Sequence, residues 1–222
     1  MNKKLIALAL TGALTCGMVL PALAVSPAAP SDPAASVTAT AQEVPALPDS
    51  VLYYGTVQQI VKDENGQITQ LWLTSEQYGE YAMNLSAETV WIDSGNRTAS
   101  DPSTLQEGES VYVFHSPIAT FSLPPQSPAF AVVRNIPMDI SCAQYHEVEE
   151  VSLVDGQLTI TTDNGGLLLR ADQNTPITLY GSGEPVALED IQPGSHLVAW
   201  YGVVAASYPG QASADCLMLL PQ

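Results

Sequence analysis

After residue 50, apolar residues alternate with polar ones or gather in runs of five to eight, and β-branched and aromatic residues are frequent among them. A period of two is typical of β-strands, and no stretch of twelve or more residues in this region has the period of a helix. The pattern therefore predicts an all-β fold. We expect strands at residues 52–61, 67–74, 80–85, 89–92, 110–115 and 129–136, and then at 145–153, 157–162, 166–171, 177–180, 196–203 and 214–220.

The second half of this region repeats the first. Residues 105–113 return 86 positions later as residues 191–199, and the Pro-rich stretch 122–129 returns 85 positions later as residues 207–214. Segments that recur in the same order and at nearly the same spacing indicate an internal duplication. The chain then divides into a signal peptide at 1–24, a spacer rich in Ala, Pro and Ser at 25–50, and two β-barrel repeats at 51–138 and 139–222.

Two kinds of turn support this division. Asn65-Gly66 and Asp155-Gly156 occupy matched places between strand-like runs, and both dipeptides suit the positive φ angles of a two-residue hairpin. Gly108 and Gly194 also match, and we expect each to follow a short helical turn and to take a positive φ angle. Short strands joined by such turns fit a small barrel, because closure removes exposed strand edges. A sandwich built from both repeats is the alternative.

The chain resembles the small OB-like β-barrel modules of unknown function that occur in exported bacterial proteins. The second repeat departs from the pattern by having His146 in the place of Gly55. The resemblance implies two tandem OB-like barrels and brings no catalytic residues with it. The residues that carry it are Gly55-Thr56-Val57-Gln58-Gln59-Ile60, Asn65-Gly66, the segment at Thr89, Leu105-x-x-Gly108-x-x-Val111-Tyr112-Val113, and Ala129-x-x-Val132.

The first 24 residues have the pattern of a secretory signal peptide: Lys3-Lys4, an apolar stretch, and Ala22-Leu23-Ala24 before the expected cleavage point. A membrane-spanning helix and lipid attachment at Cys16 are the alternatives. The chain has 23 acidic and 6 basic residues, and all the acidic ones follow this segment. Because an acidic surface repels phosphate backbones and anionic lipids, we expect no nucleic-acid partner and no membrane insertion after cleavage. The expected location is extracellular or associated with the cell envelope.

Two cysteines follow the predicted signal peptide. Cys142 leads into the second repeat and Cys216 lies in its last apolar run, so a disulfide between them would join the two ends of one barrel. The alternative is two buried free thiols, because the sequence does not fix the distance between them.

The sequence has no catalytic, cofactor-binding or metal-binding motif. His115, His146 and His196 do not occupy matched places in the two repeats, whereas a site older than the duplication is expected in both. We therefore predict that the protein is not an enzyme and needs no cofactor.

Two alternatives remain open. A metal-handling protein would bind copper through soft ligands, and a hydrolase would use a pair of carboxylates in the second repeat. The candidate residues are Met83, Met138, Met218 and His115 for copper, and Glu147, Glu149, Glu150, Glu189 and Asp190 for hydrolysis.

The Pro-rich loop at 120–128 is the predicted partner-binding element. It is nearly uncharged and carries Phe121 and Leu123 on a backbone stiffened by prolines, including Pro124 and Pro125. A rigid loop loses less entropy when it docks, so these four residues are the expected contacts. The alternative is a stiff connector that packs Phe121 on its own barrel. We thus expect a non-catalytic binding or envelope-assembly module that recognises a protein or glycan of the cell envelope.

Overall fold

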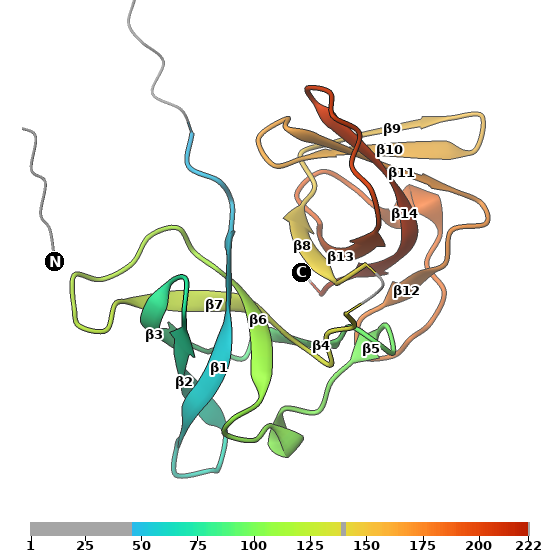
Figure 1. Cartoon of the computed structure of the whole chain (residues 1–222). Helices are drawn as coiled ribbons and strands as arrows, with labels where there is room; N and C mark the ends of the chain where they lie inside the picture. The colour runs from blue at the N-terminus through green and yellow to red at the C-terminus, as the bar shows by residue number, and fades with distance from the viewer. Residues whose placement is uncertain (1–45, 139–140, 222) are drawn as a thin grey trace, which may run out of the picture. The chain divides into compact units, whose positions relative to one another are not determined.

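The computed structural model describes residues 46–138 and 141–221, so the predicted signal peptide and most of the predicted spacer lie outside the described residues (Figure 1). Within these two ranges the chain forms fourteen strands and two single-turn 3₁₀ helices. The all-β prediction is therefore confirmed. The described residues belong to one compact unit.

The first seven strands form a closed five-stranded barrel with a two-stranded extension (Figure 1). β1 pairs with β2 and β6, β2 pairs with β3, and β6 pairs with β7. A parallel pairing of β3 with β7 closes the ring, which is the strand order of an OB-like barrel. The rest of β7 pairs with β4, which carries β5. The elements are β1 Val51–Lys62, β2 Ile68–Ser75, β3 Gly79–Asn84, β4 Val90–Asp93, β5 Thr98–Ala99, η1 Pro102–Thr104, β6 Ser110–His115 and β7 Gln126–Arg134.

The remaining strands form a half-barrel in the same order. β13 pairs with β8 and β14, and β14 pairs in parallel with β11 and β12. β10 then pairs with β11 and β9. The elements are β8 Gln144–Glu147, β9 Glu150–Val154, β10 Gln157–Thr162, β11 Leu167–Asp172, β12 Ile177–Leu179, η2 Leu188–Asp190, β13 His196–Tyr201 and β14 Gly210–Leu219.

Matched backbone hydrogen bonds support the internal duplication. Val57 exchanges two of them with the turn at 108–109, with N···O distances of 2.7 and 2.9 Å. Val148 exchanges the same two with the turn at 194–195, at 2.7 and 2.8 Å. The glycines of these turns have φ angles of 85° and 83°, and each follows a 3₁₀ turn, as predicted.

The hairpin prediction is confirmed in the second repeat and wrong in detail in the first. Asp155 and Gly156 have φ angles of 51° and 76° and join β9 to β10 as a two-residue turn. At the matched turn of the first repeat, Gly66 has a positive φ angle but Asn65 does not, and Asp63 pairs with Gln67 around a three-residue loop. The Asp63 carboxylate stabilises this longer loop, because its Oδ1 accepts hydrogen bonds from the backbone N–H of Asn65 and Gln67.

Two strand predictions also need correction. The strand expected at 145–153 is interrupted at Val148 and Glu149, because the backbone there changes partner: Val148 donates to Ser195 and Glu149 to Thr161. The two-residue strand β5 was not expected from the sequence, because it is too short to show any period.

The buried side chains form three clusters. One fills the first barrel around Tyr53 and Leu71, and another fills the second repeat around Ile160 and Leu169. The third cluster contains side chains of β4, β6 and β7 together with side chains of β13 and β14, and it includes Phe114 and Trp200. These two residues are matched in the repeats and are 4% and 0% exposed, so equivalent outer faces of the two repeats are buried together.

Candidate binding site

The loop between β6 and β7 is held by its own hydrogen bonds. Thr120 donates its N–H to Gln126 O at 2.9 Å and accepts from Gln126 N through its Oγ1 at 3.0 Å. Ser122 Oγ donates to Pro124 O at 2.8 Å. At the base, the buried Ser127 Oγ donates to the backbone carbonyl of Ser116 at 2.8 Å. These hydrogen bonds fix the backbone of the loop at its base and near its tip.

The predicted contact residues lie on this loop, with their apolar side chains in solvent. Phe121 is 108% exposed and Leu123 is 97% exposed, and Ile118 at the start of the loop is 68% exposed. Pro124 and Pro125 are half-buried. The alternative, in which Phe121 packs on its own barrel, is therefore wrong in this structure.

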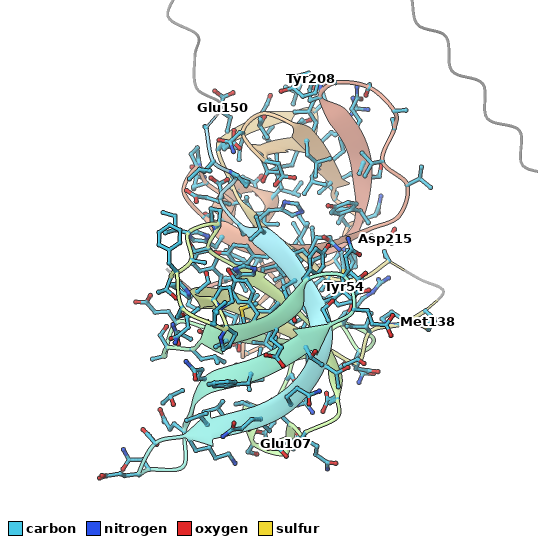
Figure 2. The ribbon with its side chains drawn as sticks, turned by 60° about the vertical axis from the view of Figure 1, so that its left-hand side comes forward. Tyr54, Glu107, Met138, Glu150, Tyr208 and Asp215 are labelled. Atoms are coloured by element: carbon cyan, nitrogen blue, oxygen red, sulfur yellow. The ribbon has the colours of Figure 1, made fainter. Side chains whose placement is uncertain are left out.

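The second repeat builds the same loop between β13 and β14. Ala205 donates its N–H to Gln211 O at 2.8 Å, as Thr120 does to Gln126, and Ser207 Oγ donates to Pro209 O at 2.8 Å. Its tip carries Tyr208, which is 87% exposed (Figure 2) and stands at the place of Leu123, and Val203 is 90% exposed. Both repeats therefore present large apolar side chains from an equivalent, hydrogen-bonded loop.

Both loops lack charged side chains. Residues 110–133 and residues 191–214 contain no Asp, Glu, Lys or Arg, although the whole chain carries a formal charge of −17. The loops are therefore uncharged apolar regions of an acidic chain. The prolines of the first loop marked it in the sequence, whereas Tyr208 becomes a candidate contact residue only through its exposure in the structure.

The histidines are held in three unrelated environments. His115 is buried, packs against Tyr81 and donates Nδ1–H to the carbonyl of Ser116 at 2.9 Å. Burial holds the pKa of His115 below its usual value, although the Ser116 bond opposes this. His196 stacks on Tyr145 and shares a hydrogen bond of 2.7 Å with its hydroxyl.

His146 is buried between two hydrogen-bonding partners of the second repeat. Its Nδ1 lies 3.0 Å from Asp163 Oδ1 and its Nε2 lies 3.1 Å from the Tyr201 hydroxyl. The pKa of Asp163 is lowered because His146 and Thr162 stabilise its carboxylate more than burial opposes it. Burial, with the charge of Asp163, raises the pKa of Tyr201. Asp163 is exposed at one end of this network, and its side chain is 52% accessible to solvent.

The candidate copper ligands do not converge. Met83 lies in the cluster inside the first barrel, Met218 lies in the third cluster, and Met138 is fully exposed. Among residues 46–138 and 141–221, no three His, Cys, Asp or Glu side chains are placed to hold a metal ion.

Two of the candidate hydrolytic carboxylates have structural partners. Glu149 Oε2 accepts a hydrogen bond of 2.9 Å from Gly165 N, and Asp190 Oδ2 accepts one of 3.1 Å from Ala187 N. Glu150 and Glu189 are exposed and Glu147 is half-buried.

Cys142 and Cys216 are both free thiols, so the disulfide that the sequence left open is not formed in the structure. Both belong to the third cluster, where burial raises the pKa of each thiol. Their neighbours Ser141 and Asp215 share a hydrogen bond of 3.0 Å, which brings the two segments together.

No protein-family model and no curated protein sequence matches this chain. Among solved structures, drosophila Unr CSD456 aligns with 79% of this chain and 63% of its own length, at 14% identity and a TM-score of 0.23. The chain thus spans less than two thirds of that protein. No helix of the described ranges has the length and apolar character needed to cross a membrane.

Proposed function

We propose that this protein is an exported, non-catalytic binding module that contacts a protein of the cell envelope through the apolar tips of its two Pro-rich loops. The observation that carries the proposal is the exposure of Phe121 and Leu123 in one repeat and of Tyr208 at the matched tip in the other. A feature retained in both copies of a duplicated module is a better candidate for function than any unmatched histidine.

The loop of the first repeat is preorganised for an apolar contact. Burying a large apolar side chain in a partner stabilises the complex by roughly 1.5–3 kcal/mol. The Thr120–Gln126 and Ser122–Pro124 hydrogen bonds already fix the loop, so little of this energy is spent on ordering its backbone. The lack of charged side chains also removes the desolvation penalty that would oppose an apolar contact.

Export and envelope location form part of the proposal because of the pattern at residues 1–24. The enzyme alternative has less support, since Glu149 and Asp190 stabilise the chain's own turns. Metal handling has less support because Met83 and Met218 lie in separate clusters.

Affinity capture with the purified chain tests the proposal. Envelope proteins retained by the unaltered chain are compared with those retained by Phe121→Ala/Leu123→Ala, and by Val203→Ala/Tyr208→Ala. We expect each double variant to lose at least part of the specific capture. Met138→Ala is the matched control, because Met138 is equally exposed but lies outside the loops. Unchanged capture by a chain carrying all four substitutions would remove the loops from the interface.

A further inference from the structure

The turn that joins β10 to β11 in the second repeat has a left-handed backbone (Figure 1). Asp163, Asn164 and Gly165 have φ angles of 60°, 54° and 72°, and Gly166 closes the turn by donating its N–H to the carbonyl of Asp163 at 3.0 Å. Positive φ angles are unfavourable for residues that carry a side chain, so a run of three persists only where surrounding contacts hold it.

Two contacts at the centre of this turn come from distant parts of the chain. The side-chain Nδ2 of Asn164 donates a hydrogen bond of 3.2 Å to the carbonyl of Leu47, which ties the segment before β1 to the second repeat. The backbone N–H of Gly165 donates one of 2.9 Å to Oε2 of Glu149, which lies in the interruption between β8 and β9. A carboxylate therefore faces the peptide nitrogen between Asn164 and Gly165.

An asparagine followed by glycine can react with its own backbone. Once the glycine nitrogen gives up its proton, it can attack the side-chain carbonyl carbon of the asparagine and close a five-membered imide. Glycine favours this reaction because it has no side chain to screen the nitrogen. At Gly165 the surroundings are open, since a Cβ atom there would meet no atom within 4 Å, and Asn164 is exposed, so ammonia can leave to solvent.

Glu149 is placed to accept the proton that this reaction must remove. A general base has to lie within hydrogen-bond reach of the proton it abstracts, and Glu149 Oε2 already accepts a hydrogen bond from Gly165 N. The other oxygen, Oε1, is buried and has no hydrogen-bond partner within residues 46–138 and 141–221. The carboxylate is thus directed at Gly165 and is not shared with another donor of these residues.

We propose that Asn164 is a site of self-catalysed deamidation, with Glu149 as the base. Gly165 N loses its proton to Glu149 Oε2 and forms a bond to Cγ of Asn164. The bond from Cγ to Nδ2 then breaks, and Nδ2 takes up the proton and leaves as ammonia. Water opens the imide and leaves aspartate or isoaspartate at position 164. The net reaction consumes one water and releases one ammonia, and it occurs once in each chain.

The modification would release the segment before β1. A carboxylate has no N–H to donate, so the hydrogen bond from residue 164 to the carbonyl of Leu47 is lost. The new negative charge also lies close to that carbonyl oxygen and repels it. The site lies outside both Pro-rich loops, so this proposal and the proposed protein contact can fail separately.

The first repeat provides an internal control, because Asn65-Gly66 is the other Asn-Gly pair in the sequence and is also exposed. Gly66 donates its N–H at 3.0 Å to the backbone carbonyl of Asp63, which is a far weaker base than a carboxylate. The carboxylate of Asp63 instead accepts from the N–H groups of Asn65 and Gln67. Asn65 therefore has the reactive sequence without a base at the glycine nitrogen.

The test compares the two sites in one sample of the purified chain. The chain is incubated at mildly alkaline pH, and peptide mass spectrometry follows the mass gain at Asn164 and at Asn65. Asn164 should convert at least about tenfold faster, because a positioned general base typically contributes more than this. In urea the two sites should convert at similar rates. Equal rates in the folded chain, or a difference that persists in urea, would overturn the proposal.

Glu149→Gln separates the base from the turn. The glutamine carbonyl can still accept the hydrogen bond from Gly165, so the turn is kept, but it cannot take up the proton. This variant should slow conversion of Asn164 to about the rate of Asn65 and leave Asn65 unchanged. Asn164→Asp provides the product as a reference and should shift the amide NMR signal of Leu47. Fast conversion of Asn164 in Glu149→Gln would overturn the role given to Glu149.

Discussion

The indole of Trp200 donates a hydrogen bond of 3.0 Å from Nε1 to the backbone carbonyl of Ser94, so a strand of the second repeat is bonded to a turn of the first. Trp200 is completely buried, and the bond lies within the cluster shared by the two repeats. A buried carbonyl that loses its donor retains its full desolvation penalty. Ser94 also accepts a hydrogen bond of 3.0 Å from the backbone N–H of Ala143 through its Oγ, so the shared cluster is held by several polar contacts.

Trp200→Phe is expected to lower the free energy of unfolding by about 2 kcal/mol, because it removes the donor to Ser94 and leaves a space where the larger ring stood. Chemical denaturation followed by circular dichroism measures the change. Trp72→Phe is the matched control, since Trp72 is 37% exposed and bonds only to Gln70 on its own strand. Equal effects of the two substitutions would contradict the structural role given to Trp200.

His115 makes stability depend on pH. Burial lowers the pKa of His115, so between its folded value and the unfolded value of about 6.5 the unfolded chain binds more protons than the folded chain. The stabilising contribution of neutral His115 is complete above the unfolded pKa and is lost as the pH falls through this window. Unfolding free energies measured from pH 5 to pH 7.5 should rise with pH. His115→Phe should flatten that rise, and His196→Gln should leave His115's contribution in place.

Arg134 holds the turn that precedes β6. Its Nε and Nη2 donate to the two carboxylate oxygens of Glu109 at 2.6 and 2.9 Å, and its Nη1 donates to Ser100, Thr104 and the backbone carbonyl of Asp101. Planar bidentate pairing is specific to arginine. Arg134→Lys should lower the free energy of unfolding by about 1–2 kcal/mol, because a lysine cannot supply the same set of donors. Arg170→Lys, whose side chain bonds to Gln211 at an exposed site, should change stability by less than about 0.5 kcal/mol.

The strands and the duplication could be predicted because they depend on local pattern. Alternation identified β6 and β10 with their observed bounds, and the matched glycines at 108 and 194 marked the turns. Phe114 and Trp200 occupy matched places in the two repeats, and both residues are buried. The sequence did not reveal that they share one cluster. Alternation of apolar and polar residues predicts which face of a strand is buried, but it does not predict which other strands pack against that face.

The candidate sites were only partly predictable for a related reason. Phe121 and Leu123 were recognised from the prolines around them, but their exposure depends on the hydrogen bonds that hold the loop away from the barrel. The surface around Gly55 depends on the register between β1, β2 and β6, which pairs Thr56 with Thr74 and with Ser110, 18 and 54 positions further along the chain. No local period encodes such a register.

Gly108 and Gly194 provide a direct test of the equivalence of the two repeats. Both have positive φ angles, and a Cβ atom at either would meet no other atom within 4 Å. The cost of an alanine there is therefore backbone strain alone, roughly 1–2 kcal/mol at each position. Gly108→Ala and Gly194→Ala should reduce the free energy of unfolding by similar amounts. Gly202→Ala is the control, because Gly202 has equal space but no positive φ angle, so it should be neutral or slightly stabilising. Unequal costs at the matched glycines would show that the two turns differ in solution.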